Sequence, residues 1–217
     1  MRLFRSTLAF TATLLVLSAG SAFAQQRGGM MLGRDAMLLS NEGVIKELKL
    51  DSAQTEKMNA LAAQTREKAQ GEMVKIRDLP QEERSEKVLQ VGKSIREDIK
   101  KSLSDFLKPD QLKRYEQISL QSRGYEALAD PEIQDKLKLT DEQKSKMKEL
   151  GASAQQKMTE LRSGFQNDRQ GTMTKMQEVR KETTTKAAAL LSESQKATWK
   201  DMTGAPIEIQ FGPPRNA

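Results

Sequence analysis

Few residues in this sequence could carry out chemistry, and two of the usual types are missing. The 217 residues include no His and no Cys, which removes the usual general base, the commonest zinc and copper ligands and any disulfide. Two pairs of adjacent acids, Glu82-Glu83 and Asp141-Glu142, stand where helices are expected to begin, and there carboxylates complement the helix dipole. No Gly-rich phosphate loop follows a strand pattern. We therefore expect no enzyme, no cofactor and no nucleotide.

Methionine is the remaining residue type that could hold a metal. Met30, Met31 and Met37 could bind copper(I) as soft ligands, which leaves open a metal-responsive sensor or buffer. The absence of His and Cys argues against that alternative. The same three residues are also typical of an N-terminal segment and its first helix, so we expect no metal site.

The first 24 residues are typical of a cleaved export signal. Arg2 and Arg5 precede a short apolar run that ends in Ala22-Phe23-Ala24, so we expect the mature chain to begin near Gln25. The net charge of +6 then becomes +4, with acids and bases interleaved along the chain. Interleaved charges are typical of solvated helix faces rather than of a nucleic-acid-binding patch.

One phrase occurs twice in the sequence. KLDSAQTEKMNAL begins at Lys49, and KLTDEQKSKMKEL begins 89 positions later at Lys138. In the second copy Thr140 is followed three residues later by Gln143, the spacing of a capping box, in which each side chain bonds the backbone N–H of the other residue. The phrase therefore predicts the first turn of a helix.

The same Leu-x-x-x-Gln register appears four times, in two pairs. In three copies a residue that can cap a helix follows the Leu, whereas Lys108 occupies that place in the other copy, which relies on Pro109 and Asp110. The motif residues are Leu50, Asp51 and Gln54; Leu107 and Gln111; Leu139, Thr140 and Gln143; and Leu191, Ser192 and Gln195.

Apolar residues between these signals recur every three or four positions, which predicts long amphipathic helices. A turn at 78–81 divides the first stretch, and a turn or a continuous helix remains open at 167–171. We expect an all-α fold of long antiparallel helical hairpins in a tandem repeat. The expected parts are a signal peptide 1–24, a flexible segment 25–33, unit 1 at 34–122, unit 2 at 123–205 and an extended tail 206–217.

Each expected unit ends in a closing helix with a large aromatic side chain at a matched position. Tyr115 and Trp199 both lie eight residues beyond the motif Leu, and we expect each to anchor its closing helix to the hairpin. If Trp199 is a core residue, its replacement by Ala should cost about 3 kcal/mol or more.

The export signal, the paired phrases and the long helices together resemble the Spy/CpxP family of LTXXQ-motif proteins. Only LTDEQ at 139–143 matches that motif fully, since LDSAQ, LKPDQ and LSESQ keep Leu and Gln but lose Thr. The resemblance implies a soluble, all-helical periplasmic protein that acts as an ATP-independent chaperone or envelope-stress regulator. Members form cradle-shaped dimers, so two tandem units imply a possible pseudo-dimer within one chain.

Three binding functions remain open at this point. The resemblance favours a chaperone for unfolded or envelope protein clients, since Met and Leu seams in a thin helical layer could stay partly open. The same seams could serve one envelope protein partner of a structural or regulatory module. A metal-responsive role is the weakest of the three, and no residue is assigned to client binding.

Overall fold

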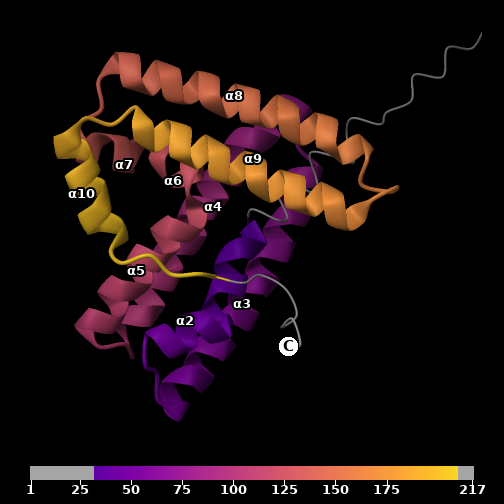
Figure 1. The fold of residues 1–217 in the computed structure, drawn as a ribbon. Coiled ribbons are helices and arrows are strands. Elements are labelled where there is room, and N and C mark those ends of the chain that lie inside the picture. Colours follow the sequence, from indigo (N-terminus) through magenta and orange to yellow (C-terminus); the bar gives the residue numbers. More distant parts are fainter. Residues whose placement is uncertain (1–31, 210–217) are drawn as a thin grey trace, which may run out of the picture.

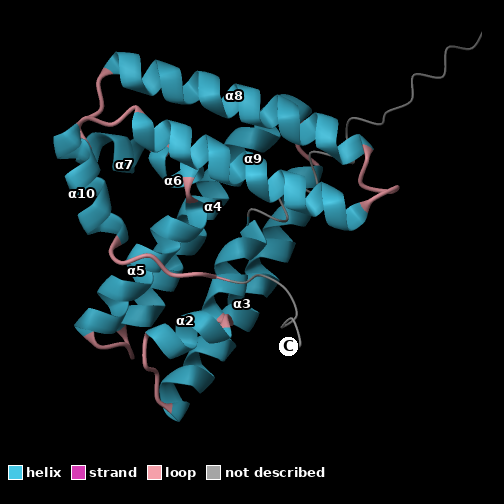
Figure 2. Cartoon of the chain, viewed as in Figure 1, coloured by secondary structure: helices cyan, strands magenta, loops and turns pink. Residues whose placement is uncertain are grey.

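The computed structural model describes residues 32–209, and every regular element in that range is a helix (Figure 2). A helical segment at 32–39 comes first, so Leu32 and Gly33 are helical although they were expected in the flexible segment. The expected signal peptide and the tail beyond 209 lie outside the described residues. The helices that follow are α2 (Glu42–Glu47), α3 (Ser52–Arg77), α4 (Gln81–Ser104), α5 (Pro109–Arg123), α6 (Tyr125–Leu128), α7 (Pro131–Lys136), α8 (Asp141–Ser163), α9 (Arg169–Ala189) and α10 (Glu193–Thr203).

Two pairs of long helices dominate the structure. Helices α3 and α4 pack along each other, as do α8 and α9, and short non-helical connections join the members of each pair (Figure 1). The connection at 78–80 lies within the predicted turn. The second connection spans 164–168, slightly earlier than the predicted 167–171, so the helix is not continuous. Asp168 caps α9, because its carboxylate accepts from the Gly171 backbone N–H at 2.8 Å.

The elements before the two long pairs correspond position by position. Helices α2 and α7 begin 89 positions apart, are both six residues long and follow the N-caps Asn41 and Asp130. Each is followed by a Leu as C-cap, and the next residue adopts a left-handed conformation, with φ 51° at Lys49 and 52° at Lys138. Such φ values are uncommon for a residue other than glycine, so the same local turn is formed twice.

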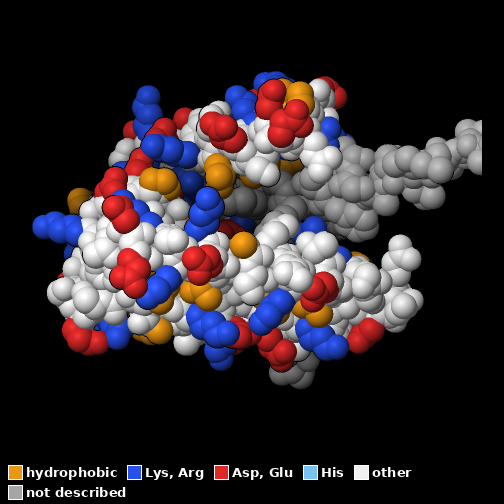
Figure 3. Space-filling view, turned by 90° about the horizontal axis from the view of Figure 1, so that it is seen from above, with side chains coloured by type: hydrophobic (Ala, Val, Ile, Leu, Met, Phe, Trp, Pro, Cys, Tyr) orange, Lys and Arg blue, Asp and Glu red, His pale blue; other side chains and the backbone are white. Residues whose placement is uncertain are grey.

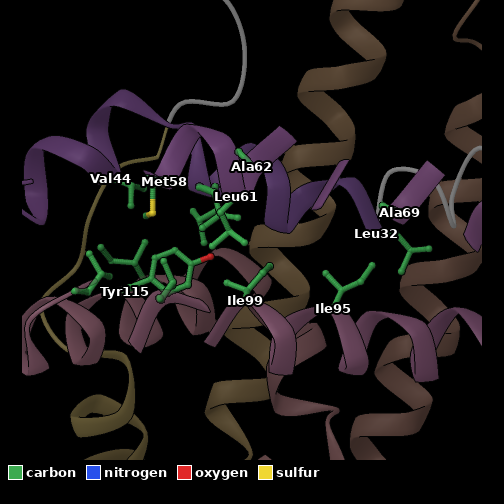
Figure 4. Packing of buried hydrophobic residues seen from close by; sticks show 14 of the residues in the cluster. Leu32, Val44, Met58, Leu61, Ala62, Ala69, Ile95, Ile99 and Tyr115 are labelled. Carbon is green, nitrogen blue, oxygen red and sulfur yellow. The ribbon is translucent and has the colours of Figure 1, made fainter. Parts of the chain in front are cut away.

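The first core cluster lies between α3 and α4 and extends under the neighbouring short helices. Met58 and Leu61 of α3 face Ile99 of α4 and Tyr115 of α5, and Leu32 lies further along the same cluster (Figure 4). Ile95, Ile99 and Leu103 on α4 are almost fully buried. Their spacing of four residues is that of one helix face, which explains why the sequence pattern predicted this core.

The second core cluster is smaller and lies where α8 and α9 meet the short helices. Its fully buried members are Leu128, Met147 and Ala187, with Ile133, Leu137, Leu139 and Leu191 around them. None of these residues comes from 148–163 of α8 or from 169–186 of α9, which make up most of both helices. The described helices therefore bury the apolar seam of α3–α4 along its length but that of α8–α9 only at one end.

The two closing helices, α5 and α10, connect the first set of helices, from 32 to α5, with the second set, α6 to α10. Helix α5 packs against α10, and the chain after α10 crosses α5 toward α2 and α3 (Figure 1). Within 32–209 no helix is long and apolar enough to cross a membrane.

Candidate functional site

Three of the four predicted helix starts have complete capping boxes. The carboxylate of Asp51 accepts from the Gln54 backbone N–H at 2.8 Å, and the Gln54 side chain accepts from the Asp51 N–H at 3.2 Å. Thr140 and Gln143 form the same two bonds at 3.2 and 3.0 Å, as do Ser192 and Gln195 at 3.3 and 2.8 Å. The capping prediction from the motif register therefore agrees with the contacts of these residues.

The start of α5 has only half of a capping box. The Gln111 side chain accepts from the Lys108 backbone N–H at 2.9 Å. The Lys108 ammonium has no acceptor atom, so it cannot return the bond to the first turn. Pro109 occupies the first helical position, where its missing N–H leaves no donor unpaired.

The motif glutamines also pair with each other, which the sequence analysis did not foresee. The Gln54 side-chain NH2 donates to Gln111 Oε1 at 2.9 Å, and the Gln111 NH2 donates back to Gln54 Oε1 at 3.2 Å. Gln143 and Gln195 form the same reciprocal pair at 2.7 and 3.0 Å. Each pair fastens the start of a long helix to the start of the closing helix, 57 or 52 residues further on.

Each motif glutamine donates a further bond to a backbone carbonyl. Gln54 donates to Phe106 O at 3.0 Å, and Gln143 donates to Leu190 O at 2.7 Å, which is the matched residue directly before the next motif Leu. The partners of Gln111 and Gln195 are Leu48 O and Lys138 O. The four glutamines therefore connect the ends of the two helix pairs that lie opposite the turns. The regular recurrence of the motif in two pairs was a sequence signal for this contact.

The four motif leucines lie beside these glutamine pairs. Leu107, Leu139 and Leu191 are buried, whereas Leu50 is half-buried and packs against the first cluster. The two predicted aromatic anchors also differ in how deeply they are buried. Tyr115 is 4% exposed within the first cluster, whereas Trp199 is half-buried at the edge of the second. Both aromatic residues contact the core that their closing helix was predicted to join.

A charged cluster connects the helix at 32–39 and α4 of the first set with the residues around α6 and α7 of the second set. Arg34 forms an ion pair with Glu126 at 2.7 Å, and Arg123 forms one with Asp130, the N-cap of α7, at 2.5 Å. Arg96 of α4 lies 3.8 Å from the same Asp130 carboxylate. Asp35 is 5% exposed inside this cluster, and burial raises its pKa although three arginines nearby lower it.

The residues considered for chemistry lie apart from one another. Glu82 and Glu83 are exposed in the first turn of α4, and Asp141 and Glu142 are exposed in the first turn of α8, where their charge complements the helix dipole. Among residues 32–209 no three His, Cys, Asp or Glu side chains gather to hold a metal ion. Met37 is 47% exposed, and Met30 and Met31 lie outside the described residues.

The outer half of the α8–α9 pair leaves apolar side chains half-buried. We call this set the outer seam; it consists of Met158, Leu161, Phe165, Met176 and Val179. None of the five belongs to either core cluster. Leu161 and Val179 line a shallow depression of about 390 Å³ whose rim carries Lys157, Glu160, Lys175, Glu178 and Glu182.

The short helices that precede each long pair explain why the apolar seam of one pair is buried further along its length than that of the other. In the first set Leu32 reaches α4 near Gly92, where its side chain lies 3.6 Å from the place of an added Cβ. In the second set Tyr125 of α6 packs where α8 begins, and its hydroxyl donates to Met147 O at 2.7 Å. A Cβ at Gly151 would lie 2.1 Å from that hydroxyl oxygen, so Tyr125 requires a glycine there. Tyr125 therefore covers α8 around Met147 and Gly151 and stops short of the outer seam.

Charged side chains surround the apolar ones over the surface. In the view of Figure 3, apolar side chains emerge in small groups between acids and bases rather than as one broad patch. Lys157 lies 3.7 Å from Glu182, which also pairs with Lys186 at 2.6 Å. The hydrogen bond from Lys186 and the charges of both lysines lower the pKa of Glu182, which keeps it ionised beside the outer seam.

Comparison with known proteins gives no match. No family model matches the chain, and no curated protein and no solved structure is similar to it.

Proposed function

We propose that this chain is an exported helical binding protein, an ATP-independent chaperone or envelope-stress protein of the periplasm that resembles Spy/CpxP. The observation that carries the proposal is the outer seam, a row of half-buried Met, Leu, Phe and Val side chains bordered by charged residues. The comparisons name no relative, so the periplasmic and stress-related parts of the proposal rest on the motif resemblance and the export signal.

The contrast between the two helix pairs supports the proposal. On α4 the residues at the places of Met176 and Val179, counted from the next motif Leu, are Gly92 and Ile95, which are both buried. The outer seam, by contrast, lacks a covering helix among the described residues. An apolar surface that is left open in one of two matched places is a candidate for binding another chain.

The chemistry of the outer seam suits varied clients. Met158 and Met176 have unbranched, flexible side chains that can adapt to different partners. Lys157, Lys175 and Glu178 on the rim provide both signs of charge, so no single client charge is excluded. Binding to such a small apolar surface should be weak and reversible, as a chaperone that uses no ATP requires.

We further propose that residues 34–122 and 123–205 are two copies of one unit that pair as a pseudo-dimer. The matched caps, the matched left-handed lysines and the two glutamine pairs support the duplication. The contact between α5 and α10, which hold the same place in their units, supports the pairing. Small-angle scattering from the mature protein should show one compact particle. A freely jointed two-bead particle would contradict the pairing.

The proposed activity is tested by suppression of aggregation of a chemically denatured client. Stoichiometric amounts of the mature protein should suppress light scattering by the client, because exposed client segments bind the outer seam. Leu161→Glu should reduce this suppression, since it places a charge in the apolar row. Leu89→Glu is the control, because Leu89 is 59% exposed on α4 and lies outside the outer seam.

Two results would count against the chaperone proposal. An absence of suppression by the folded wild-type protein would overturn it. Recovery of one dominant partner from envelope extracts, in place of many weak ones, would favour a structural or regulatory module that uses the same surface.

A further inference from the structure

The segment after α10 leaves its own set of helices and crosses to the first set. Residues 204–209 form neither helix nor strand and run as a drawn-out chain over α5 toward α2 (Figure 1). Gly204 starts this path with φ +67°, and a Cβ there would lie 2.3 Å from the Gln117 side chain. A residue with a side chain would be strained at this position, so the glycine directs the tail onto α5.

One glutamine side chain on α5 binds the backbone of the last residue of α10 and two points on this tail. The Gln121 NH2 donates to Thr203 O at 2.6 Å and to Ala205 O at 2.8 Å. The Gln121 Oε1 accepts from the Ile207 backbone N–H at 3.0 Å. These bonds recognise a peptide backbone and not a particular side chain, so another extended segment could form them.

The side chains of the tail alternate between the core and solvent. Ile207 and Ile209 are half-buried and pack against the first core cluster, whereas Glu208 between them is exposed. The Glu208 carbonyl lies 4.0 Å from the place of an added Cβ at Gly43, which puts the tail beside the start of α2. Backbone hydrogen bonds combined with contacts from alternate side chains are how many proteins bind extended peptides.

We propose that this face, formed by Gln121, Gly43 and the adjoining part of the first core cluster, is a peptide-binding site. We call it the tail site. Its ligands are extended segments with aliphatic side chains at alternate positions, and residues 205–209 occupy it as an intramolecular ligand. This proposal goes beyond the outer seam, since it concerns the other set of helices and a different kind of client segment.

The covalent attachment of the tail makes it a competitor for this site. Gly204 follows α10 directly, so the tail is held next to its site at an effective concentration in the millimolar range that is typical of short linkers. A free segment with the same pattern therefore binds the intact protein weakly. Release of the tail should raise the affinity of the tail site for free segments.

The test measures binding of a fluorescent peptide with the sequence of residues 203–211 to the full mature chain. The wild type is compared with the double variant Ile207→Asp/Ile209→Asp, whose tail is expected to leave the apolar face. The variant should bind the peptide about tenfold more tightly or better, because the tethered competitor is gone. A peptide with both Ile residues replaced by Asp should not bind, and Gln121→Leu added to the variant should weaken binding again.

A second variant is truncated after Gly204. It lacks the tail entirely, so it covers the case in which the two Asp substitutions release the tail only in part. Equal peptide affinity for the wild type and for both folded variants would overturn the proposal, and so would no binding to either variant. Loss of helical structure in both variants would also overturn it, because the tail would then be a structural strap. None of these results depends on suppression of aggregation, so the outer seam and the tail site are judged separately.

Discussion

At the scale of single residues, each motif glutamine performs two tasks with one amide group. The Oε1 of Gln54 completes the cap of α3 and also accepts from Gln111, while its NH2 donates to Gln111 and to Phe106 O. Only a side chain with both a donor and an acceptor can make this set of bonds. This explains why the Gln of the motif recurs in all four copies whereas the capping residue varies.

Gln54→Glu should destabilise the protein by about 1–3 kcal/mol, the usual cost of leaving buried polar groups unpaired. The carboxylate could still accept from Asp51 N–H, but it would place an acceptor against Phe106 O and Gln111 Oε1. Chemical denaturation followed by circular dichroism measures the loss. Gln64→Glu is the matched control, because Gln64 is exposed on the same helix. An equal loss in both variants would contradict the role of the amide pair.

The buried carboxyl group of Asp35 predicts that the stability of the folded protein depends on pH. Burial raises its pKa, so the folded state binds this proton more tightly than the unfolded chain does. The stability that this provides is present at acid pH and is lost as the pH rises through the raised pKa. The charged groups that act on it are Arg34, Arg96, Arg123 and Glu126. Burial raises the pKa of Tyr115, and the charge of Asp35 adds to that rise.

Asp35→Asn should therefore gain stability relative to the wild type as the pH rises above about 4, the ordinary pKa of the carboxyl group. Denaturation of both proteins across a series of pH values measures the difference between their free energies of unfolding. Values at about pH 3, where both side chains are neutral, provide the reference. A difference that moves in favour of the wild type with rising pH would show that the arginines outweigh burial.

At the scale of helices, the starts were predictable because the signals for them are local. A capping residue and a Gln three positions later determine the first turn, so α3, α8 and α10 begin where the sequence indicates. The end of α8 was less predictable, since no Pro marks it and its place depends on how Phe165 and Asp168 pack and cap. The pairing of the glutamines was not predicted, because it joins residues more than 50 positions apart.

A substitution at Lys108 should complete the cap of α5 and so stabilise the protein. Lys108→Thr should raise the free energy of unfolding by about 0.5–2 kcal/mol over Lys108→Ala, because the hydroxyl can accept from the Gln111 N–H and complete the box. Thermal or chemical denaturation of the two variants measures this difference. Equal stabilities would show that the Gln111 half of the box already satisfies the first turn.

The two closing helices should differ in how strongly they are anchored. Tyr115→Ala removes a side chain that is 4% exposed and should cost about 3–5 kcal/mol, as is usual for large buried aromatic residues. Trp199→Ala should cost less, because Trp199 is only half-buried. The cost of about 3 kcal/mol or more applied only if Trp199 were a core residue. Chemical denaturation of both variants checks the order, and a larger loss for Trp199→Ala would contradict it.

At the scale of the whole molecule, the two sets of helices are matched in their elements but not in what covers them. The sequence pattern predicted apolar seams on both helix pairs and could not show which would stay open. That depends on the path of distant segments, namely the helix at 32–39, Tyr125 and the tail around Ile207. The candidate binding surface was therefore not predictable from local spacing, whereas the all-helical fold was.

Hydrogen–deuterium exchange of the mature protein, with and without a saturating denatured client, tests the central claim most directly. The account predicts that the client slows exchange in the outer parts of α8 and α9, around Leu161 and Val179, more than at the matched positions on α3 and α4. An unchanged exchange rate in the outer seam while the client is bound would contradict the account.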